Sequence, residues 1–453
     1  MNFISPALQV LKQYAGENET NLKLLLSNHL NRISNGNESQ SDSIRYTVTR
    51  TVYGVIRHIK LLDYLIGQCS DRPLNRIQSD IKILLEIGAF LLLFSSSYPD
   101  YAVLNETVSA SPKKTRSFVN AVLRNMTRNK EKLFGSIDKI EDPTIRFSVS
   151  PAIVHHLKKL SPNWIDDLKY LDSEPAFHIR FDPRVLDYIK AGEILNSHRI
   201  EFKELHAFKS FELKEVRRVL HELMDSYPFF VQDAGSQSIS IIASQYARSL
   251  VADVCAAPGT KSVTLALLNP SIPIIANDID FGRVRLIKET ITRLNIHSIY
   301  PVVSDARNPG FSHKISSQMN KNPDFIIVDA PCTSSGTLRK SPDLKLKINE
   351  NSISRNAGLQ YEIIAPWFNE VNTFWNYLLY SVCSFIYDET EAVMNRISQI
   401  AKDFNYDSFE WIDLSSELQS LGFNFIRAEK GFYLMPGPLN NDIFYLSLIK
   451  KSK

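Results

Sequence analysis

Two cysteines stand directly after short apolar runs of the sequence. One closes the segment Asp329-Ala-Pro-Cys332, and the other lies within Ser381-Val-Cys383-Ser384. A cysteine thiolate is a strong nucleophile, and a nearby carboxylate can exchange protons with a substrate. An isolated cysteine in such a place is more often a small buried apolar residue. Two of them, one beside an aspartate, favour a cysteine nucleophile.

A third segment, Asp253-Val-Cys-Ala-Ala-Pro-Gly-Thr-Lys-Ser262, follows another apolar run and opens a helical pattern. In α/β proteins such a loop binds a cofactor through its amides and the helix N-terminus. A phosphate-binding P-loop is excluded because Thr260 separates Gly259 from Lys261, and the dinucleotide fingerprint G-x-G-x-x-G is absent. A tight turn without a ligand is the alternative.

Aspartates follow two further apolar runs. Asp278 comes after Ile272–Ala276, and Asp305 comes after Ile299–Val303. A carboxylate at the first position could accept hydrogen bonds from ribose hydroxyls, and one at the second from an adenine amino group. Either aspartate alone is more often a helix N-cap. With the loop at 253–262, ligand-capable residues follow three successive runs.

Residues 227–450 supply the elements that must position these side chains. Five strand-like runs alternate there with helical patterns, and this order predicts a parallel, doubly wound sheet. Because the carboxyl ends of parallel strands share one edge of a sheet, the motifs are expected to meet there. The five runs are Ser249–Val254, Ile272–Ala276, Ile299–Val303, Phe325–Val328 and Tyr377–Tyr380.

Two further domains are expected ahead of this one, so the predicted division is 1–140, 143–225 and 227–453. The first is predicted to be all-helical because its apolar residues recur at helical spacing. The second reads as a small α/β module of linker type. Its predicted strand is Ala176–Arg180, and its predicted helices are Val185–Asn196 and Leu213–Met224.

The charge is unevenly distributed. The whole chain of 453 residues carries a net charge of +3, while residues 1–150 hold 19 Lys and Arg against 14 acids. Much of this excess lies in a basic run that contains a single acid, Glu131. A solvated helix face and an RNA-facing surface both explain it. The run consists of Lys113, Lys114, Arg116, Arg124, Arg128, Lys130 and Lys132.

Composition excludes several classes of protein. Four well-separated cysteines give neither a disulfide framework nor a zinc-ligand spacing, which fits a reducing cytosol. The most apolar stretch, Ile81–Phe94, contains Lys82 and Glu86 and is shorter than the roughly 20 residues that span a bilayer. It is therefore predicted to be a buried helix, and a cytoplasmic protein is expected. A monomer is the default expectation.

Taken together, the motifs resemble those of the RNA cytosine-5 methyltransferases of the Nol/Nop/Sun family. The segments containing Cys332 and Cys383 match the two cysteine motifs that distinguish this family from other S-adenosylmethionine enzymes. The N-terminal part, from Arg72-Pro73 to Phe118–Arg124, is similar to a NusB-like RNA-binding domain. This combination resembles the family members that act on bacterial small-subunit ribosomal RNA, and the likeness covers nearly the whole chain.

The resemblance implies a Rossmann-like catalytic domain, S-adenosylmethionine as methyl donor and no metal. Cys383 would add to C6 of cytosine and so make C5 nucleophilic toward the methyl group. Cys332 would assist release of the product, Asp329 would hydrogen-bond the cytosine edge, and Lys261 would lie near both. The residues implied to hold S-adenosylmethionine are Cys255, Ala256, Ala257, Pro258, Gly259, Thr260, Lys261, Asp278, Asp305 and Asp329.

The sequence departs from the family pattern at four places. Thr260 replaces a glycine, so the first loop is expected to sit differently, because threonine lacks glycine's freedom at positive φ. Ser334 stands where glycine is common, and Val382 stands where threonine is usual. Asn372–Asn376 fills a region that usually holds a glycine pair. None of these changes removes a catalytic group.

Two alternatives stay open at this point. A non-catalytic RNA-binding or assembly factor, built on the NusB-like domain, would explain the basic run without any chemistry. A second alternative keeps the methyl transfer and changes the substrate to transfer RNA.

Overall fold

The computed structural model describes residues 3–451 apart from 17–20, 34–37, 96–97, 215–222, 224–225, 309–314, 316, 369–373 and 404–408. The chain divides into two compact units. The first is Met1–His155 with Ser341–Lys347, and the second is His156–Lys340 with Ile348–Lys453. The finer division at 1–140, 143–225 and 227–453 stays a prediction.

The first unit is helical, as predicted for residues 1–140. Its central helix is α5 (Ser79–Phe94), which contains the predicted buried stretch and is apolar around most of its circumference. The late segment Ser341–Lys347 belongs here because the Lys345 carbonyl accepts a hydrogen bond from the Ser150 amide at 2.7 Å. The other helices are α1 (Ile4–Gly16), α2 (Leu22–Ile33), α3 (Glu38–Arg57), α4 (Ile59–Cys69), η1 (Leu74–Arg76), α6 (Asp100–Ala110), α7 (Arg116–Arg128), α8 (Lys130–Ile137), α9 (Pro143–Arg146) and α18 (Leu344–Lys347), with α10 (Pro151–Leu160) at the boundary.

The second unit contains a small antiparallel sheet in the order β2-β3-β1-β4. The predicted strand at 176–180 is β1 (Phe177–Phe181), and the first predicted helix is α12 (Tyr188–Ser197). The second predicted helix, 213–224, is wrong at its start. Leu213 ends a strand and pairs with Phe177, because its side chain faces the core of this sheet, and most of the remaining segment lies outside the described residues. The neighbouring elements are α11 (Trp164–Asp172), β2 (Phe202–Leu205), η2 (His206–Phe208), β3 (Ser210–Leu213) and β4 (Phe229–Val231).

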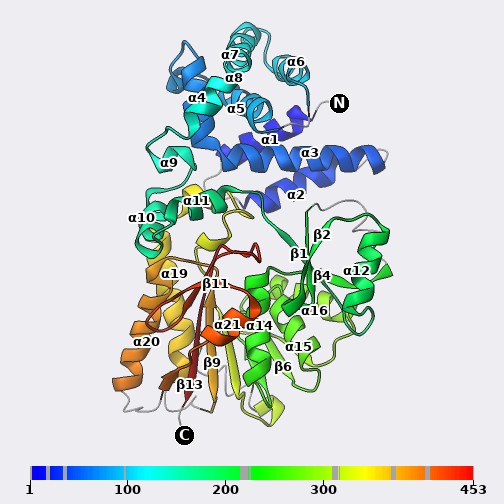
Figure 1. The fold of residues 1–453 in the computed structure, drawn as a ribbon, viewed down its shortest axis with the longest axis vertical. Helices are drawn as coiled ribbons and strands as arrows, with labels where there is room; N and C mark the ends of the chain where they lie inside the picture. Colours follow the sequence, from blue (N-terminus) through cyan, green and yellow to red (C-terminus); the bar gives the residue numbers. More distant parts are fainter. Residues whose placement is uncertain are drawn as a thin grey trace. The chain divides into compact units, whose positions relative to one another are not determined.

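A nine-stranded mixed sheet forms the core of the second unit (Figure 1). All five predicted strands are present, and they pair in parallel in the order β9-β8-β5-β6-β7. An antiparallel edge of four strands, β10 to β13, extends this sheet beyond the parallel part that the sequence predicted. The strands are β5 (Val251–Asp253), β6 (Ile274–Asp278), β7 (Ile299–Val303), β8 (Phe325–Asp329), β9 (Tyr377–Val382), β10 (Phe409–Trp411), β11 (Asn424–Arg427), β12 (Phe432–Met435) and β13 (Phe444–Lys451).

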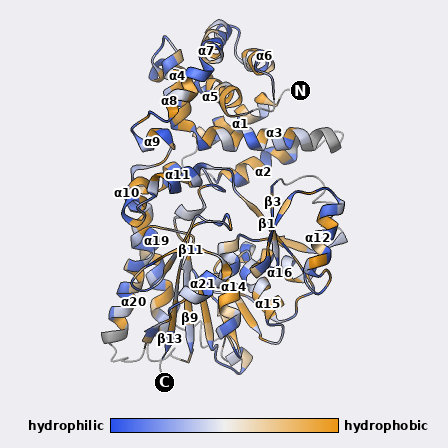
Figure 2. Cartoon of the chain, viewed as in Figure 1, coloured by the Kyte–Doolittle hydropathy of each residue, from blue (hydrophilic) through white to orange (hydrophobic). Residues whose placement is uncertain are grey.

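The order of the parallel strands reverses at β5, which pairs with β6 on one side and β8 on the other. Such a reversal opens a crevice at the carboxyl ends of the strands. Helices α14 to α16 cover one face of the sheet and α19 and α20 lie on the other (Figure 1), and the strands between them are mainly hydrophobic (Figure 2). The helical segments are α14 (Ala234–Tyr246), α15 (Thr260–Leu268), α16 (Phe281–Arg293), η3 (Ser335–Thr337), α19 (Glu350–Ile364), η4 (Ala365–Phe368), η5 (Tyr387–Glu389), α20 (Glu391–Asp403) and α21 (Ser415–Leu421).

The described helices include none that combines the length and the apolar character needed to cross a bilayer.

Candidate active site

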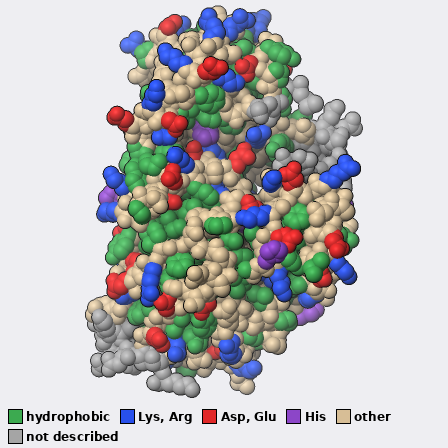
Figure 3. Space-filling view, in the orientation of Figure 1, with side chains coloured by type: hydrophobic (Ala, Val, Ile, Leu, Met, Phe, Trp, Pro, Cys, Tyr) green, Lys and Arg blue, Asp and Glu red, His purple; other side chains and the backbone are tan. Residues whose placement is uncertain are grey.

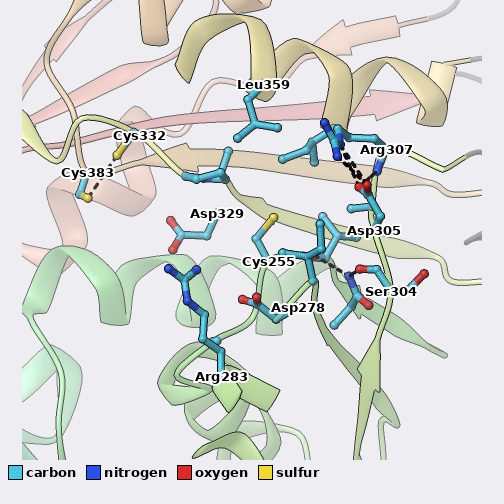
Figure 4. Close-up of a pocket in the computed structure, with 18 of the residues that line it drawn as sticks. Cys255, Asp278, Arg283, Ser304, Asp305, Arg307, Asp329, Cys332, Leu359 and Cys383 are labelled. Atoms are coloured by element: carbon cyan, nitrogen blue, oxygen red, sulfur yellow. Dashed lines mark hydrogen bonds and ion pairs between the residues drawn. The ribbon is translucent and has the colours of Figure 1, made fainter. Parts of the chain in front are cut away.

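A cavity of about 530 Å³ lies at the carboxyl edge of the parallel strands (Figure 4). It brings together residues from the loops that follow β5, β6, β7, β8 and β9, as the strand order requires. Most of the predicted site residues line it: Cys255, Ala257, Asp278, Asp305, Asp329, Cys332 and Cys383. The remaining ones lie in the loop after β5 and in the first turn of α15, close to these in the chain.

The two motif cysteines meet in this cavity although 51 residues separate them. Their sulfur atoms are 3.4 Å apart, and both side chains are half-buried (Figure 4). The hydrogen bond to Cys383 and burial together raise the pKa of the Cys332 thiol well above its usual value. Cys332 therefore keeps its proton at neutral pH.

A buried carboxylate joins the two cysteine loops. Glu389 accepts hydrogen bonds from the amide and hydroxyl of Thr333, at 2.7 and 2.6 Å, and from the hydroxyl of Ser384 at 2.6 Å. Thr333 follows Cys332 and Ser384 follows Cys383, so the Glu389 side chain holds the two cysteine loops in a fixed position relative to each other. No role for Glu389 was predicted from the sequence, although it stands six residues after Cys383.

Gly336 brings the Cys332 loop against the backbone of the Cys383 loop. Its amide donates to the Cys383 carbonyl at 3.0 Å, and its carbonyl accepts from the Ile443 amide at 3.2 Å. A Cβ atom at this position would lie 1.9 Å from the Ile443 carbonyl oxygen. Backbone atoms cannot move aside as a flexible side chain does, so this close approach requires glycine.

Gly336→Ala is expected to lower the free energy of unfolding by about 1–3 kcal/mol, because the added methyl group must push two backbone segments apart. Urea unfolding measures the change. The matched control is Gly358→Ala in α19, where nothing lies within 4 Å of the added Cβ. That substitution should leave stability unchanged or raise it, since alanine has the higher helix propensity. Equal changes in the free energy of unfolding of the two variants would contradict the close approach of Gly336 to the Ile443 carbonyl.

Asp329 ends β8 and forms an ion pair with the ammonium of Lys261 from α15. Its other oxygen accepts a hydrogen bond from the Ser381 hydroxyl at 2.9 Å, because Asp329 and Ser381 are direct partners in the parallel register. Burial alone would lower the pKa of Lys261, but the Asp329 carboxylate more than offsets it and raises that pKa. Lys261 is therefore a fixed cation paired with Asp329, which lines the cavity.

The loop after β5 turns sharply into α15. Gly259 has φ = +98°, and its amide donates to the Ala256 carbonyl at 2.7 Å. The turn therefore requires glycine at position 259. Thr260 is the first residue of α15 and is not among the residues with positive φ. The expectation that Thr260 would displace the loop for lack of glycine's freedom is therefore wrong. The side chain of Asn277 ties the loop down by donating to the Val254 and Ser304 carbonyls at 3.0 Å.

The two predicted cofactor aspartates differ in their surroundings. Asp278 is buried at the end of β6, and one of its oxygens accepts from the Asp280 amide at 3.1 Å. Both oxygens of Asp305 accept from the Arg307 guanidinium, which lowers the pKa of that carboxyl (Figure 4). No role was predicted for several other residues that line the cavity: Ile279, Arg283, Ala306, Leu359 and Ile363.

Asp253, at the end of β5, is fully buried and bonds to the Ser262 hydroxyl at 2.6 Å. Burial raises its pKa from 3.8 to about 7. Because the folded protein holds this proton more tightly than the unfolded chain, Asp253 should reduce stability as the pH rises from about 4 to about 7. In Asp253→Asn that loss should disappear. Urea unfolding of both proteins across this range tests the point, and parallel curves for the two would refute it.

The far end of the Cys332 loop is anchored by buried charges. The Lys340 ammonium lies 3.0 Å from Asp233 and 2.5 Å from Asp442. The buried Arg339 guanidinium donates to the Asn440 side chain at 2.6 Å and lies over the Tyr170 ring. Breaking one partner of such a buried set leaves an uncompensated charge, so these residues hold the loop in place.

Two segments of the chain match known protein families. Residues 241–450 match the family described as 16S rRNA methyltransferase RsmB/F, and residues 5–128 match the NusB family. A relative from Bacillus subtilis named probable ribosomal RNA small subunit methyltransferase B is 27% identical over 431 residues, which cover 91% of each chain. A ribosomal RNA small subunit methyltransferase B from Escherichia coli is 25% identical over 99% of each chain.

The fold has a counterpart among solved structures. The crystal structure of PH0851 matches with a TM-score of 0.71 at 18% identity, covering 99% of this chain and 98% of that one. Residues 241–450 are therefore a domain of the RsmB/F methyltransferase family, and residues 5–128 are a domain of the NusB family.

Proposed function

We propose that this protein transfers a methyl group from S-adenosylmethionine to C5 of a cytosine in small-subunit (16S) ribosomal RNA. The observation that carries this proposal is the pair of thiols 3.4 Å apart, beside Asp329, in one cavity. The names of relatives, ribosomal RNA small subunit methyltransferase B, support ribosomal RNA as the substrate.

The residues present suit S-adenosylmethionine. Asp278 and Asp305 lie at neighbouring strand ends, where carboxylates can accept from ribose hydroxyls and an adenine amino group. Apolar groups of Ile279, Ala306 and Leu359 line the same cavity and suit a flat base. The loop 255–261 would hold the remaining part. When bound, this cofactor supplies a methyl group already activated by a sulfonium charge.

Cys383 acts as the nucleophile. Its thiolate adds to C6 of the cytosine, an S–C6 bond forms, and the electron pair of the C5–C6 double bond makes C5 nucleophilic. Asp329 hydrogen-bonds the cytosine edge and supports protonation of the ring as the adduct forms, while Lys261 holds Asp329 in position. After the methyl group is transferred, C5 loses its proton, the S–C6 bond breaks and the double bond returns. Cys332 assists this release.

The target base must leave its stack to reach the cavity. The helical unit has exposed basic side chains that are suited to neutralising RNA phosphates outside the catalytic domain. They are Lys113, Lys114, Arg116, Arg124 and Arg128. Figure 3 shows Lys and Arg side chains at the surface of this unit. Lys130 is paired with Asp100 at 3.2 Å and is less available for this role.

Bisulfite sequencing of total RNA from a strain that lacks this protein tests the proposal. One methylcytosine should disappear from small-subunit ribosomal RNA and return when the wild-type gene is restored. A loss confined to transfer RNA would overturn the choice of substrate. Calorimetry separates the non-catalytic alternative: RNA binding without S-adenosylmethionine binding would favour an assembly factor.

A further inference from the structure

One residue of the Cys332 loop contacts both sulfur atoms. The Ser334 amide donates to the Cys332 sulfur at 3.4 Å, and the Ser334 hydroxyl lies 3.5 Å from the Cys383 sulfur. The same hydroxyl is 4.0 Å from the Cys332 sulfur. The half-buried Ser334 side chain therefore sits where the two thiols face each other.

The hydroxyls of the two serines at the ends of the Ser381–Ser384 segment are committed to carboxylates. Ser384 donates to Glu389 at 2.6 Å, and Ser381 donates to Asp329 at 2.9 Å. Val382, directly before the cysteine, has no hydroxyl at all. Within the described part of the chain, Ser334 is thus the hydroxyl that meets the Cys383 sulfur.

The backbone holds Ser334 in a conformation that side chains other than glycine rarely adopt. Its φ is 57° and its ψ is 31°, in the left-handed region. The Ser334 carbonyl accepts from both the amide and the hydroxyl of Thr337 at 3.0 Å, which fixes this turn. Strained residues of this kind concentrate at functional sites, where the surrounding structure supports them.

We propose that the Ser334 hydroxyl donates a hydrogen bond to the Cys383 thiolate and so is a further catalytic residue of this enzyme. The proposal rests on the proposed role of Cys383 as nucleophile. In the thiol form, Cys383 donates to the Ser334 oxygen, as the structure has it. When the proton leaves, the hydroxyl turns and donates to the sulfur instead, which favours the charged form.

The charged groups that face Cys383 do not fully stabilise its thiolate, so the Ser334 hydroxyl has a role to fill. Lys261 is the nearby cation, but its ammonium is already paired with Asp329. Cys332 is a thiol that keeps its proton, and Glu389 on η5 adds negative charge close to the pair. A neutral donor on the sulfur therefore supplies stabilisation that these groups do not fully provide.

The test compares Ser334→Ala with Ser334→Gly in the full chain. Alanine keeps the Cβ and removes only the oxygen, whereas glycine also relieves the left-handed strain. The rate at which iodoacetamide alkylates Cys383, followed by peptide mass spectrometry, should shift to higher pH by about 0.5–1 pH unit in both variants. Methyl transfer at neutral pH should fall by about threefold to tenfold in both.

Asn295→Gly is the matched control, because Asn295 also has positive φ, at 48°, and is exposed after α16. Its alkylation profile and its rate should equal those of the wild type. An unchanged pH profile of alkylation in both Ser334 variants would overturn the proposal. A shift in the alanine variant alone would also overturn it, because the shift would then be caused by backbone strain and not by loss of the hydroxyl. Alkylation needs no RNA, so this result stands apart from a failure of the proposed nucleophile, which Cys383→Ala would reveal.

Discussion

Replacing Cys383 with alanine is expected to reduce methyl transfer to RNA to less than about one thousandth of the wild-type rate. C5 of cytosine is a poor nucleophile, so the reaction depends on prior formation of the S–C6 bond. Cys332 cannot take this place, because it keeps its proton and the hydrogen bonds of its loop fix it. Transfer of tritiated methyl groups to RNA measures the effect.

Two controls make this result specific. Cys69→Ala changes a buried cysteine of the helical unit and should retain activity. Unaltered binding of S-adenosylmethionine by the Cys383→Ala protein would exclude a collapse of the cavity. A Cys383→Ala enzyme with wild-type activity would refute the covalent mechanism.

Replacing Cys332 with alanine should give the opposite kind of defect, an accumulated covalent complex between protein and RNA. Cys383 can still add to C6 and C5 can still take up the methyl group, but the group proposed to assist release, 3.4 Å from the Cys383 sulfur, is gone. The complex should appear as a slowly migrating band on denaturing gels, and ribonuclease should collapse it. Most of the enzyme should become trapped after a single turnover.

The double variant Cys332→Ala with Cys383→Ala provides the control for this experiment, because it lacks the sulfur that would form the bond. It should show no such band. Normal turnover by the Cys332→Ala protein would show that release does not need this thiol. An adduct in the double variant would show that the bond forms at some other residue.

The parallel part of the sheet could be predicted because its signal is local. Each strand is a short apolar run, and each run ends at a motif residue such as Asp278 or Asp329. The antiparallel strands β10 to β12 were not predicted, since they are only three or four residues long. The predicted helix start at Leu213 was wrong because pairing with Phe177 buries that side chain more effectively than a helix start would.

The candidate site divides in the same way. The chemistry-bearing residues, Cys332, Cys383 and Asp329, follow strands and could be found from residue type and spacing. The residues that hold them in place could not be found so. Glu389 acts on Thr333, 56 residues away, and Gly336 meets Ile443. Such pairs leave no pattern in a single sequence because tertiary packing alone brings the two partners together.

By itself, the sequence determined which side chains would gather at the carboxyl edge of the sheet, because strand order and polarity bring the ends of parallel strands together. Only the tertiary structure decided how they face one another. It set the two sulfur atoms 3.4 Å apart, paired Lys261 with Asp329, and aimed the Ser334 hydroxyl at Cys383. These distances depend on packing between distant segments, which residue type and spacing along the chain do not encode.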